Sequence, residues 1–210
     1  MTILALEFSS SRRSVALAHE TGPVLAEAVE STGGRGTNAL GLIDQALAAA
    51  RLSRQAIDVL AVGLGPGSYT GIRAALAVAQ GWQLARNVKT LGISSTESLA
   101  AQAQAEGLHG RVHLVMDAQR GEYYLARWEI SDTERRSLSP LAIVPAAELA
   151  AREAVGEICA GPDRKRALFP SAAMLAILAQ TRCDFVSAET LTPIYLRETM
   201  FVKAPASRNV

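Results

Sequence analysis

A glycine-rich segment between an apolar run and a helical pattern constrains the fold more than any other part of the sequence. Residues 57–62 (IDVLAV) are short, apolar and β-prone, which is typical of a buried strand. Residues 63–71 (GLGPGSYTG) then supply the glycine and proline of a tight turn, and Ser68 or Thr70 can cap a following helix. The segment therefore predicts a strand–turn–helix unit of an α/β protein.

The chemistry of this loop has two interpretations. A helix that begins after a glycine turn presents free N–H groups, which can bind a phosphate. However, the loop lacks the lysine of a Walker A motif, and the G-x-G-x-x-G register fails by one residue after Gly67. A tight turn without a ligand explains the same residues at least as well, so both interpretations stay open here.

Small residues recur at every fourth position of the helix expected after the loop. Gly71, Ala75 and Ala79 form one row, and Ala77, Gly81 and Ala85 form a second. A helix expected over residues 38–51 is equally rich in small side chains. Such faces let another helix approach to the short end of the usual range of roughly 8–10 Å, whereas the alternative is that alanine simply favours helix.

The glycines inside these helices favour the interpretation as a packing interface over simple helix propensity. A glycine inside a helix lowers stability, so its presence there needs a structural reason. Two helices that each present a small-residue face are suited to pack against a partner protein. The predicted partner-interface residues are Leu42, Ala46, Ala49, Gly71, Ala75, Val78, Ala79 and Trp82.

Composition narrows the function classes. The net charge of +1 gives no long-range attraction to nucleic acid or to an anionic membrane. The chain has two cysteines, too few for a disulfide framework, and no apolar run near the ~20 residues that span a bilayer. Met1 leads directly into a strand, which leaves no room for a signal peptide. We therefore expect a reduced, cytoplasmic protein without a membrane segment.

A pattern of strand, acidic residue, turn and strand occurs twice. The acidic residue is Glu7 in the first copy and Asp117 in the second. The segment 106–110, between the two copies, is typical of a linker. The duplication predicts two related α/β subdomains, residues 1–105 with the interface helices and a smaller one over residues 106–210. An alternative for the extreme C-terminus is that it packs back on the first subdomain.

Four segments, in order along the chain, resemble the bacterial TsaB (YeaZ) family. They are ILALEFSSSRRSVALA at the start, VGLGPGSYTGIRAALAVAQGWQLA in the middle, LVMDAQRGEYYLA in the second half and PIYLRE near the end. The resemblance covers nearly the whole chain, and GPGSYTGIR is specific to this family. It implies an α/β fold of the actin-like, sugar kinase and Hsp70 (ASKHA) type, ribonuclease H-like, with two subdomains around a cleft.

The resemblance also implies a function. TsaB proteins are non-catalytic partners and activators of TsaD, which forms N6-threonylcarbamoyladenosine at position 37 of tRNA. The expected partners are TsaD in a heterodimer and the ATPase TsaE, which the subunit helps to recruit. We expect a homodimer when TsaD is absent, contact with tRNA only through the complex, and no membrane association.

The metal site of the catalytic relative is not expected here. Its two histidine ligands correspond to Ser95 and Leu99, and leucine cannot bind a metal. His109 and His113 also have four-residue spacing, but they lie across a linker and a strand start, where their imidazoles should not converge. No catalytic residue, metal ligand or cofactor is therefore predicted.

Nucleotide binding is expected to be weak at most. The resemblance implies a vestigial site at Glu7, Ser10, Asp117 and Gly161, with the alternatives that Glu7 only accepts hydrogen bonds from its own turn and that Arg120 pairs with Asp117. The competing function is an enzyme in its own right, either a metal-dependent peptidase or an ATP-dependent enzyme.

A third alternative, a tRNA-binding module acting alone, is disfavoured by the near-neutral charge. Scattered arginines remain available to help within a complex; they are Arg12, Arg13, Arg35 and Arg197. The chain also departs from the family's usual pattern at Thr37-Asn38, where a His-Ser pair is common, and over residues 167–181, which look shortened.

Overall fold

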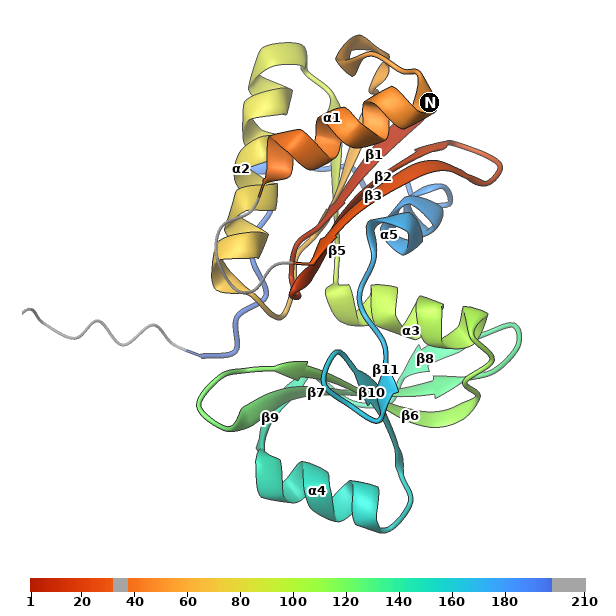
Figure 1. Ribbon diagram of the computed structural model, residues 1–210, viewed down its shortest axis with the longest axis vertical. Coiled ribbons are helices and arrows are strands. Elements are labelled where there is room, and N and C mark those ends of the chain that lie inside the picture. The colour runs from red at the N-terminus through yellow and green to blue at the C-terminus, as the bar shows by residue number, and fades with distance from the viewer. Residues whose placement is uncertain (32–37, 198–210) are drawn as a thin grey trace, which may run out of the picture.

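The computed structural model describes residues 1–31 and 38–197, which form two β-sheets at opposite ends of the molecule (Figure 1). Strand β1 pairs with β2 in antiparallel and with β4 in parallel orientation, so the first sheet is mixed. In spatial order this sheet contains β3 (Val24–Ser31), β2 (Arg12–His19), β1 (Thr2–Glu7), β4 (Val59–Gly63) and β5 (Lys89–Ile93). Every residue of β1 and β4 is buried, as their continuous apolar runs predict for central strands.

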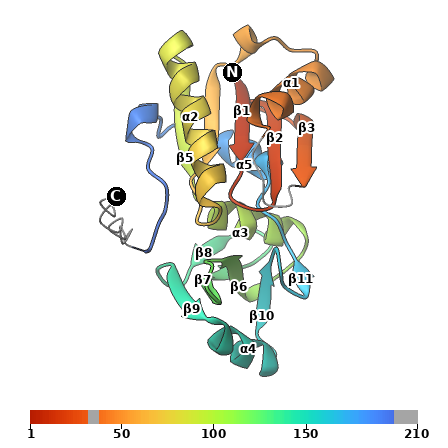
Figure 2. The same ribbon diagram turned by 60° about the vertical axis from the view of Figure 1, so that its left-hand side comes forward.

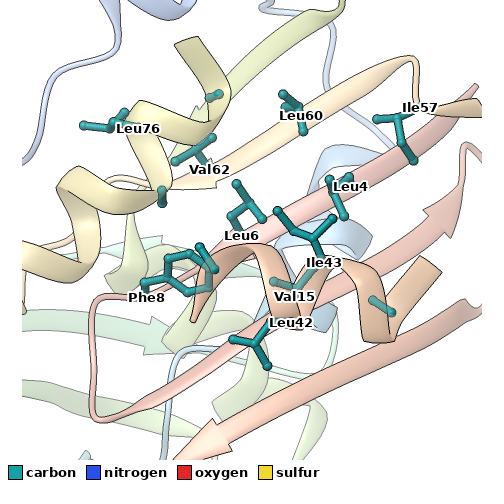
Figure 3. Close-up of a cluster of buried hydrophobic side chains, with 14 of the residues drawn as sticks. Leu4, Leu6, Phe8, Val15, Leu42, Ile43, Ile57, Leu60, Val62 and Leu76 are labelled. Atoms are coloured by element: carbon teal, nitrogen blue, oxygen red, sulfur yellow. The ribbon is translucent and has the colours of Figure 1, made fainter. Parts of the chain in front are cut away.

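Helices cover both faces of the first sheet. Helices α1 (Ala39–Ala50) and α2 (Tyr69–Arg86) lie on one face, and α5 (Ala172–Ala179) lies on the other (Figure 1). Because side chains alternate along a strand, Leu4 and Leu6 of β1 pack toward α1 and α2. Figure 3 shows this core, in which leucines of the sheet meet residues of the two helices. The α/β class and the strand–turn–helix unit predicted for residues 57–86 are confirmed.

Local signals place the helix ends. The Asn38 side chain accepts a hydrogen bond from the N–H of Gly41, and the Ser68 side chain accepts one from the N–H of Gly71. Of the two caps considered for α2, Ser68 is therefore the one used. Helix α1 ends at Ala50, and its C-cap residue Arg51 adopts the left-handed conformation common after a helix. None of the helices in the two described ranges is long and apolar enough to cross a membrane.

The second sheet has its own two layers of helix. Helix α3 (Ser95–Ala105) packs on one face through Leu99, and α4 (Ala146–Ala154) packs on the other through Leu149. Figure 2 shows α3 between the two sheets and α4 at the far end of the molecule. The strands, in spatial order, are β11 (Arg166–Ala167), β10 (Ile158–Gly161), β6 (Gly110–Asp117), β7 (Glu122–Ile130) and β8 (Arg135–Ser137), and β9 (Ala142–Pro145) also pairs with β7.

From α5 onward the chain returns to the first sheet. Helix α5 packs against β1 and β2 (Figure 2), and the short 3₁₀ helix η2 (Ala188–Thr190) lies beside α2. A second short 3₁₀ helix, η1 (Arg54–Ala56), follows α1. The N–H of Ile194 donates to the carbonyl of Leu64 at 2.8 Å. The two sheets thus fall on either side of residue 105, while α5 and the residues after it belong spatially with the first sheet. Arg35 and Thr37 lie outside the described residues.

Candidate functional site

The glycine-rich loop is pressed against the turn that follows β1. A Cβ atom on Gly67 would lie 2.1 Å from the carbonyl oxygen of Ser9, and one on Gly71 would lie 1.9 Å from that of Phe8. The N–H of Ser68 donates to the same Ser9 carbonyl at 2.7 Å. Only glycine allows backbones to approach this closely, so the packing of the loop accounts for these two glycines without a bound phosphate.

Glu7 is enclosed beneath this loop rather than exposed to a ligand. Its side chain is 0% exposed, and one carboxylate oxygen accepts from the N–H of Ser9 at 2.8 Å. The other accepts from the hydroxyl of Ser95 at 2.9 Å, and that hydroxyl in turn accepts from the N–H of Gly65 at 3.2 Å. Burial raises the pKa of Glu7, and the hydrogen bonds from Ser9 and Ser95 oppose this rise. Glu7 therefore joins β1, the loop and the start of α3.

The other residues of the expected nucleotide site are also used internally. Ser10 is buried and its hydroxyl donates to the carbonyl of Arg12 at 3.0 Å. Asp117 is exposed, and it accepts from the backbone and side-chain nitrogens of Gln119 at 2.7 and 2.6 Å, whereas the alternative considered was a pairing with Arg120. A Cβ on Gly161 would lie 2.0 Å from the carbonyl oxygen of Val115, so this glycine serves strand packing. Among the described residues, no hydrogen bond joins Glu7, Ser10 and Asp117 to one another.

The positions that correspond to the metal ligands are occupied by the core. Leu99 is fully buried between α3 and the second sheet, and Ser95 is bound to Glu7. His109 pairs with Asp132 at 3.2 Å and His113 pairs with Glu157 at 2.9 Å, so the two imidazoles do not share a site. No group of three or more metal-binding side chains occurs within residues 1–31 and 38–197.

Most of the residues predicted for the partner interface lie in the chain's own core. Leu42 and Ala46 of α1 and Gly71, Ala75 and Ala79 of α2 are buried against the first sheet. The reason is the helical period: in α2 the large residues at positions 72 and 76 point to the sheet, and positions 75 and 79 share their face. The row 71–75–79 therefore faces inward.

The second row of small residues faces outward. Ala77, Gly81 and Ala85 are exposed, and Val78 and Trp82 beside them are half-buried. Leu84 is 90% exposed and Leu40, on α1, is 58% exposed. An apolar groove of about 420 Å³ lies between α1 and α2, and its lining comprises Leu40, Arg54, Gln55, Ala77, Val78, Gly81, Trp82, Ala85 and Arg86. Ala49 of the predicted interface is also exposed.

Gly81 is the most informative residue of this groove. A Cβ at this position would meet no atom within 4 Å, so the chain's own packing does not require a glycine. Glycine inside a helix costs about 1 kcal/mol relative to alanine. The rim is held in place by Arg86, whose guanidinium donates to the carbonyls of Arg54 and Gln55 at 3.1 and 2.9 Å. The groove is thus an ordered apolar surface, and the packing of the chain itself does not require the glycine at position 81.

An aromatic and ionic cluster, absent from the sequence-based prediction, ties the C-terminal stretch to both halves. The rings of Tyr69 and Tyr195 stack with centroids 5.3 Å apart, and the guanidinium of Arg73 lies 4.2 Å from the Tyr69 centroid. Two residues later, Arg197 forms an ion pair with Glu122 of β7. The aromatic side chains at positions 69 and 195 are visible in the sequence. Their spacing along the chain, however, does not indicate that they contact each other.

Comparison with known proteins adds to this picture. A family model described as TsaD: tRNA N6-adenosine threonylcarbamoyltransferase matches residues 36–195. A protein of Escherichia coli named tRNA threonylcarbamoyladenosine biosynthesis protein TsaB is 32% identical over 129 residues, which cover 61% of this chain and 55% of that protein. The protein of the same name from Haemophilus influenzae is 34% identical over 130 residues, covering 60% of this chain and 53% of that protein. The chain spans about half the length of these curated relatives.

Two solved structures agree with this chain over 93% of its length. YeaZ from Pseudomonas aeruginosa superposes with a TM-score of 0.77 at 31% identity, over 93% of this chain and 99% of that one. A second structure from the same organism, described as similar to peptidase YeaZ, superposes with a TM-score of 0.78 at 32% identity. The second sheet and the returning C-terminal stretch are therefore shared with these proteins.

Proposed function

Because this chain belongs to the TsaB/YeaZ family, we propose that it acts in the biosynthesis of N6-threonylcarbamoyladenosine in tRNA, as a non-catalytic subunit that binds and activates TsaD. The first sheet has the order β3-β2-β1-β4-β5, and together with the superposition on YeaZ it agrees with the actin-like, ribonuclease H-like fold expected from the sequence.

The observation that carries the proposal is the outward face of α2. Gly81 and its neighbours Ala77 and Ala85 leave the backbone of α2 open to a second helix, and Leu40 and Leu84 supply apolar area beside it. Burying such side chains contributes about 25 cal/mol per Å² of apolar surface. The face therefore suits a helix-on-helix interface with TsaD, or with a second copy of this chain when TsaD is absent.

The competing function, a metal-dependent peptidase or an ATP-dependent enzyme, is less well supported. Leu99 fills core space where a ligand would be needed, and Glu7 is enclosed by hydrogen-bond donors of its own chain. In the proposed complex TsaD carries the chemistry, TsaE is recruited to the assembly, and tRNA binds only to the complex in the cytoplasm. A tightly bound stoichiometric metal in the purified protein would overturn this assignment.

Replacement of Gly81 by arginine tests the interface. Gly81→Arg should abolish co-elution with TsaD on size-exclusion chromatography and lower tRNA modification in a reconstituted mixture with TsaD and TsaE. Arginine is a better helix former than glycine, and its side chain has open space, so the fold itself should be undamaged.

A matched control separates interface loss from any general effect of charge. Ala150→Arg adds the same side chain to an exposed position of α4, in the other half of the molecule, and should leave co-elution intact. Undiminished complex formation by Gly81→Arg would refute the proposed docking face. Unchanged tRNA modification in mixtures that omit this chain altogether would refute the proposed function.

A further inference from the structure

The chain crosses between the two halves of the molecule at two neighbouring places. The first crossing is Ser94, between β5 and α3, and the second is residues 168–171, between β11 and α5. The hydroxyl of Ser98 on α3 donates to the carbonyl of Ser171 and accepts from the N–H of the same residue, both at 3.4 Å. The two crossings therefore lie side by side, an arrangement that resembles a hinge between domains.

Buried and paired polar groups hold the halves together on the side of these crossings. Glu7 of β1 is 0% exposed and accepts from the hydroxyl of Ser95, the first residue of α3, at 2.9 Å. Arg182, after α5, pairs with Glu97 of α3 at 3.2 Å. Separation of a buried carboxyl group from its hydrogen-bond donors is costly, so the halves should stay in contact on this side.

A third connection, residues 191–197, lies away from the second crossing, and we call it the C-terminal strap. In Figures 1 and 2 it runs beside α2 toward the second sheet, whereas the segment that leads into α5 lies on the other side of the start of α3. The N–H of Ile194 donates to the carbonyl of Leu64 at 2.8 Å, and the ring of Tyr195 stacks on that of Tyr69. These contacts attach the strap to the first half.

Arg197 attaches the strap to the second half. Its guanidinium forms an ion pair with Glu122, the first residue of β7, and donates to the carbonyl of Gln119 in the preceding turn at 3.4 Å. The side chains of the ion pair are 30% and 41% exposed, and Tyr69 is 46% exposed. Exposed ion pairs are weak and are screened by salt. Water therefore reaches the contacts of the strap, in contrast to the buried Glu7 on the side of the crossings.

We propose that the C-terminal strap is a latch that fixes the orientation of the two halves. With Arg197 bound to Glu122, the halves are joined on both sides and do not turn about the crossings. When Arg197 and Tyr195 are released, the second half rotates about the crossings, and the molecule opens on the side of the strap. The hydrogen bonds of Glu7 stay intact in this motion. The latch involves no partner and is therefore independent of the function proposed above.

The test is a distance measurement between the halves by pulsed electron paramagnetic resonance. Spin labels on Ile177→Cys of α5 and Ala150→Cys of α4 report the orientation, because both positions are exposed and belong to different halves. The background is Cys183→Ser, since Cys183 is exposed, whereas Cys159 is buried and stays unlabelled. The labelled chain is mixed with an excess of unlabelled chain, so that only distances within one molecule are measured. We expect a single narrow distribution at low salt.

Release of the strap should move the labels. Tyr195→Ala combined with Arg197→Ala should shift or broaden the distribution beyond the width measured with the strap intact. Leu196→Ala, at an exposed position of the same strap, is the matched control and should leave the distribution unchanged. Salt at 1 M shortens the screening length to about 3 Å, so it should move the chain with an intact strap part of the way toward the double variant. An unchanged distribution in the double variant would overturn the proposal.

Charge reversal distinguishes the ion pair from a general loss of packing. Arg197→Glu places two carboxylates together and should broaden the distribution, and the addition of Glu122→Arg restores the attraction and should narrow it again. Thermal unfolding of each labelled variant verifies that both halves remain folded. A distribution that stays broad in the doubly reversed variant would also overturn the proposal, because the ion pair would then not hold the halves in place.

Discussion

The two sides of helix α2 use small residues for opposite purposes. On the inner side, Gly71 packs against the carbonyl of Phe8, and a Cβ there would lie 1.9 Å from that oxygen. On the outer side, Gly81 faces open space. The same residue type is thus required by the fold at one position and left unexplained by the fold ten residues later. A glycine that its own chain does not need indicates a surface on which something else packs.

The largest effect is expected from a charge on the inner side. Ala75→Arg places a guanidinium where the structure leaves no exposed surface, because Ala75 is fully buried against the first sheet. We expect the free energy of unfolding in urea to fall by more than about 4 kcal/mol, or the protein not to fold. Ala77→Arg, two residues further on the exposed side, is the control and should change stability by no more than about 0.5 kcal/mol. Equal stabilities of the two variants would contradict the assignment of inner and outer sides.

At position 71, the tightest contact on the inner side of α2, the addition of a single methyl group should be enough to destabilise the fold. Gly71→Ala forces the new Cβ toward a backbone oxygen that cannot move aside without displacing the turn after β1. Overpacking of this kind costs about 1–3 kcal/mol, and we expect the upper end of this range in urea denaturation. A variant as stable as the unmodified chain would mean that the loop can move away from Phe8.

Glu7, the buried carboxyl group beneath the loop on the inner side, makes the stability of the fold depend on pH. The pKa of Glu7 is raised above the ordinary value of 4.5, so its bound proton stabilises the fold fully below that value. This contribution is lost as the pH rises from 4.5 through the raised pKa of the folded state. Glu7→Gln cannot ionise, so its stability relative to the unmodified chain should increase in urea denaturation as the pH rises from 4.5 through the raised pKa of Glu7. A difference that is constant with pH would show that Glu7 is not perturbed by burial.

The smallest effect, and one of opposite sign, is expected at the outer glycine. Gly81→Ala should raise the free energy of unfolding by about 0.5–1 kcal/mol, because alanine favours helix and its methyl group meets no atom. For a chain of this size the midpoint of thermal unfolding should rise by about 1–4 °C. Destabilisation by this variant would mean that Gly81 serves the fold after all, and the comparison would fail.

The sequence allowed much of the fold to be predicted, because the local signals agree with the tertiary structure. Residues 57–86 contain an apolar run, a glycine turn and a capping serine, and all of them are used as expected. The inward orientation of Gly71, Ala75 and Ala79 was not predicted, although the large residues Ile72 and Leu76 beside them form the usual core pattern. Small residues alone do not distinguish a helix packed on its own sheet from one packed on a partner.

The polar sites were harder to predict for a different reason. His113 and Arg127 become neighbours only through the pairing of β6 with β7, and Arg152 and Glu157 join them from another element. Glu7 likewise meets Ser95 across 88 positions of the chain. Such contacts depend on strand register and on how helices pack, which no local pattern of residues contains.

The return of helix α5 to the first sheet has a consequence for how the protein is made. Strands β1 to β5 end at Ile93, but the helix that covers one face of their sheet begins only at Ala172. During synthesis, residues such as Ile3 and Leu91 on that face stay uncovered while residues 94–171 leave the ribosome. The strands of the second sheet, which end at Ala167, are therefore all synthesised before the helix that covers this face of the first sheet.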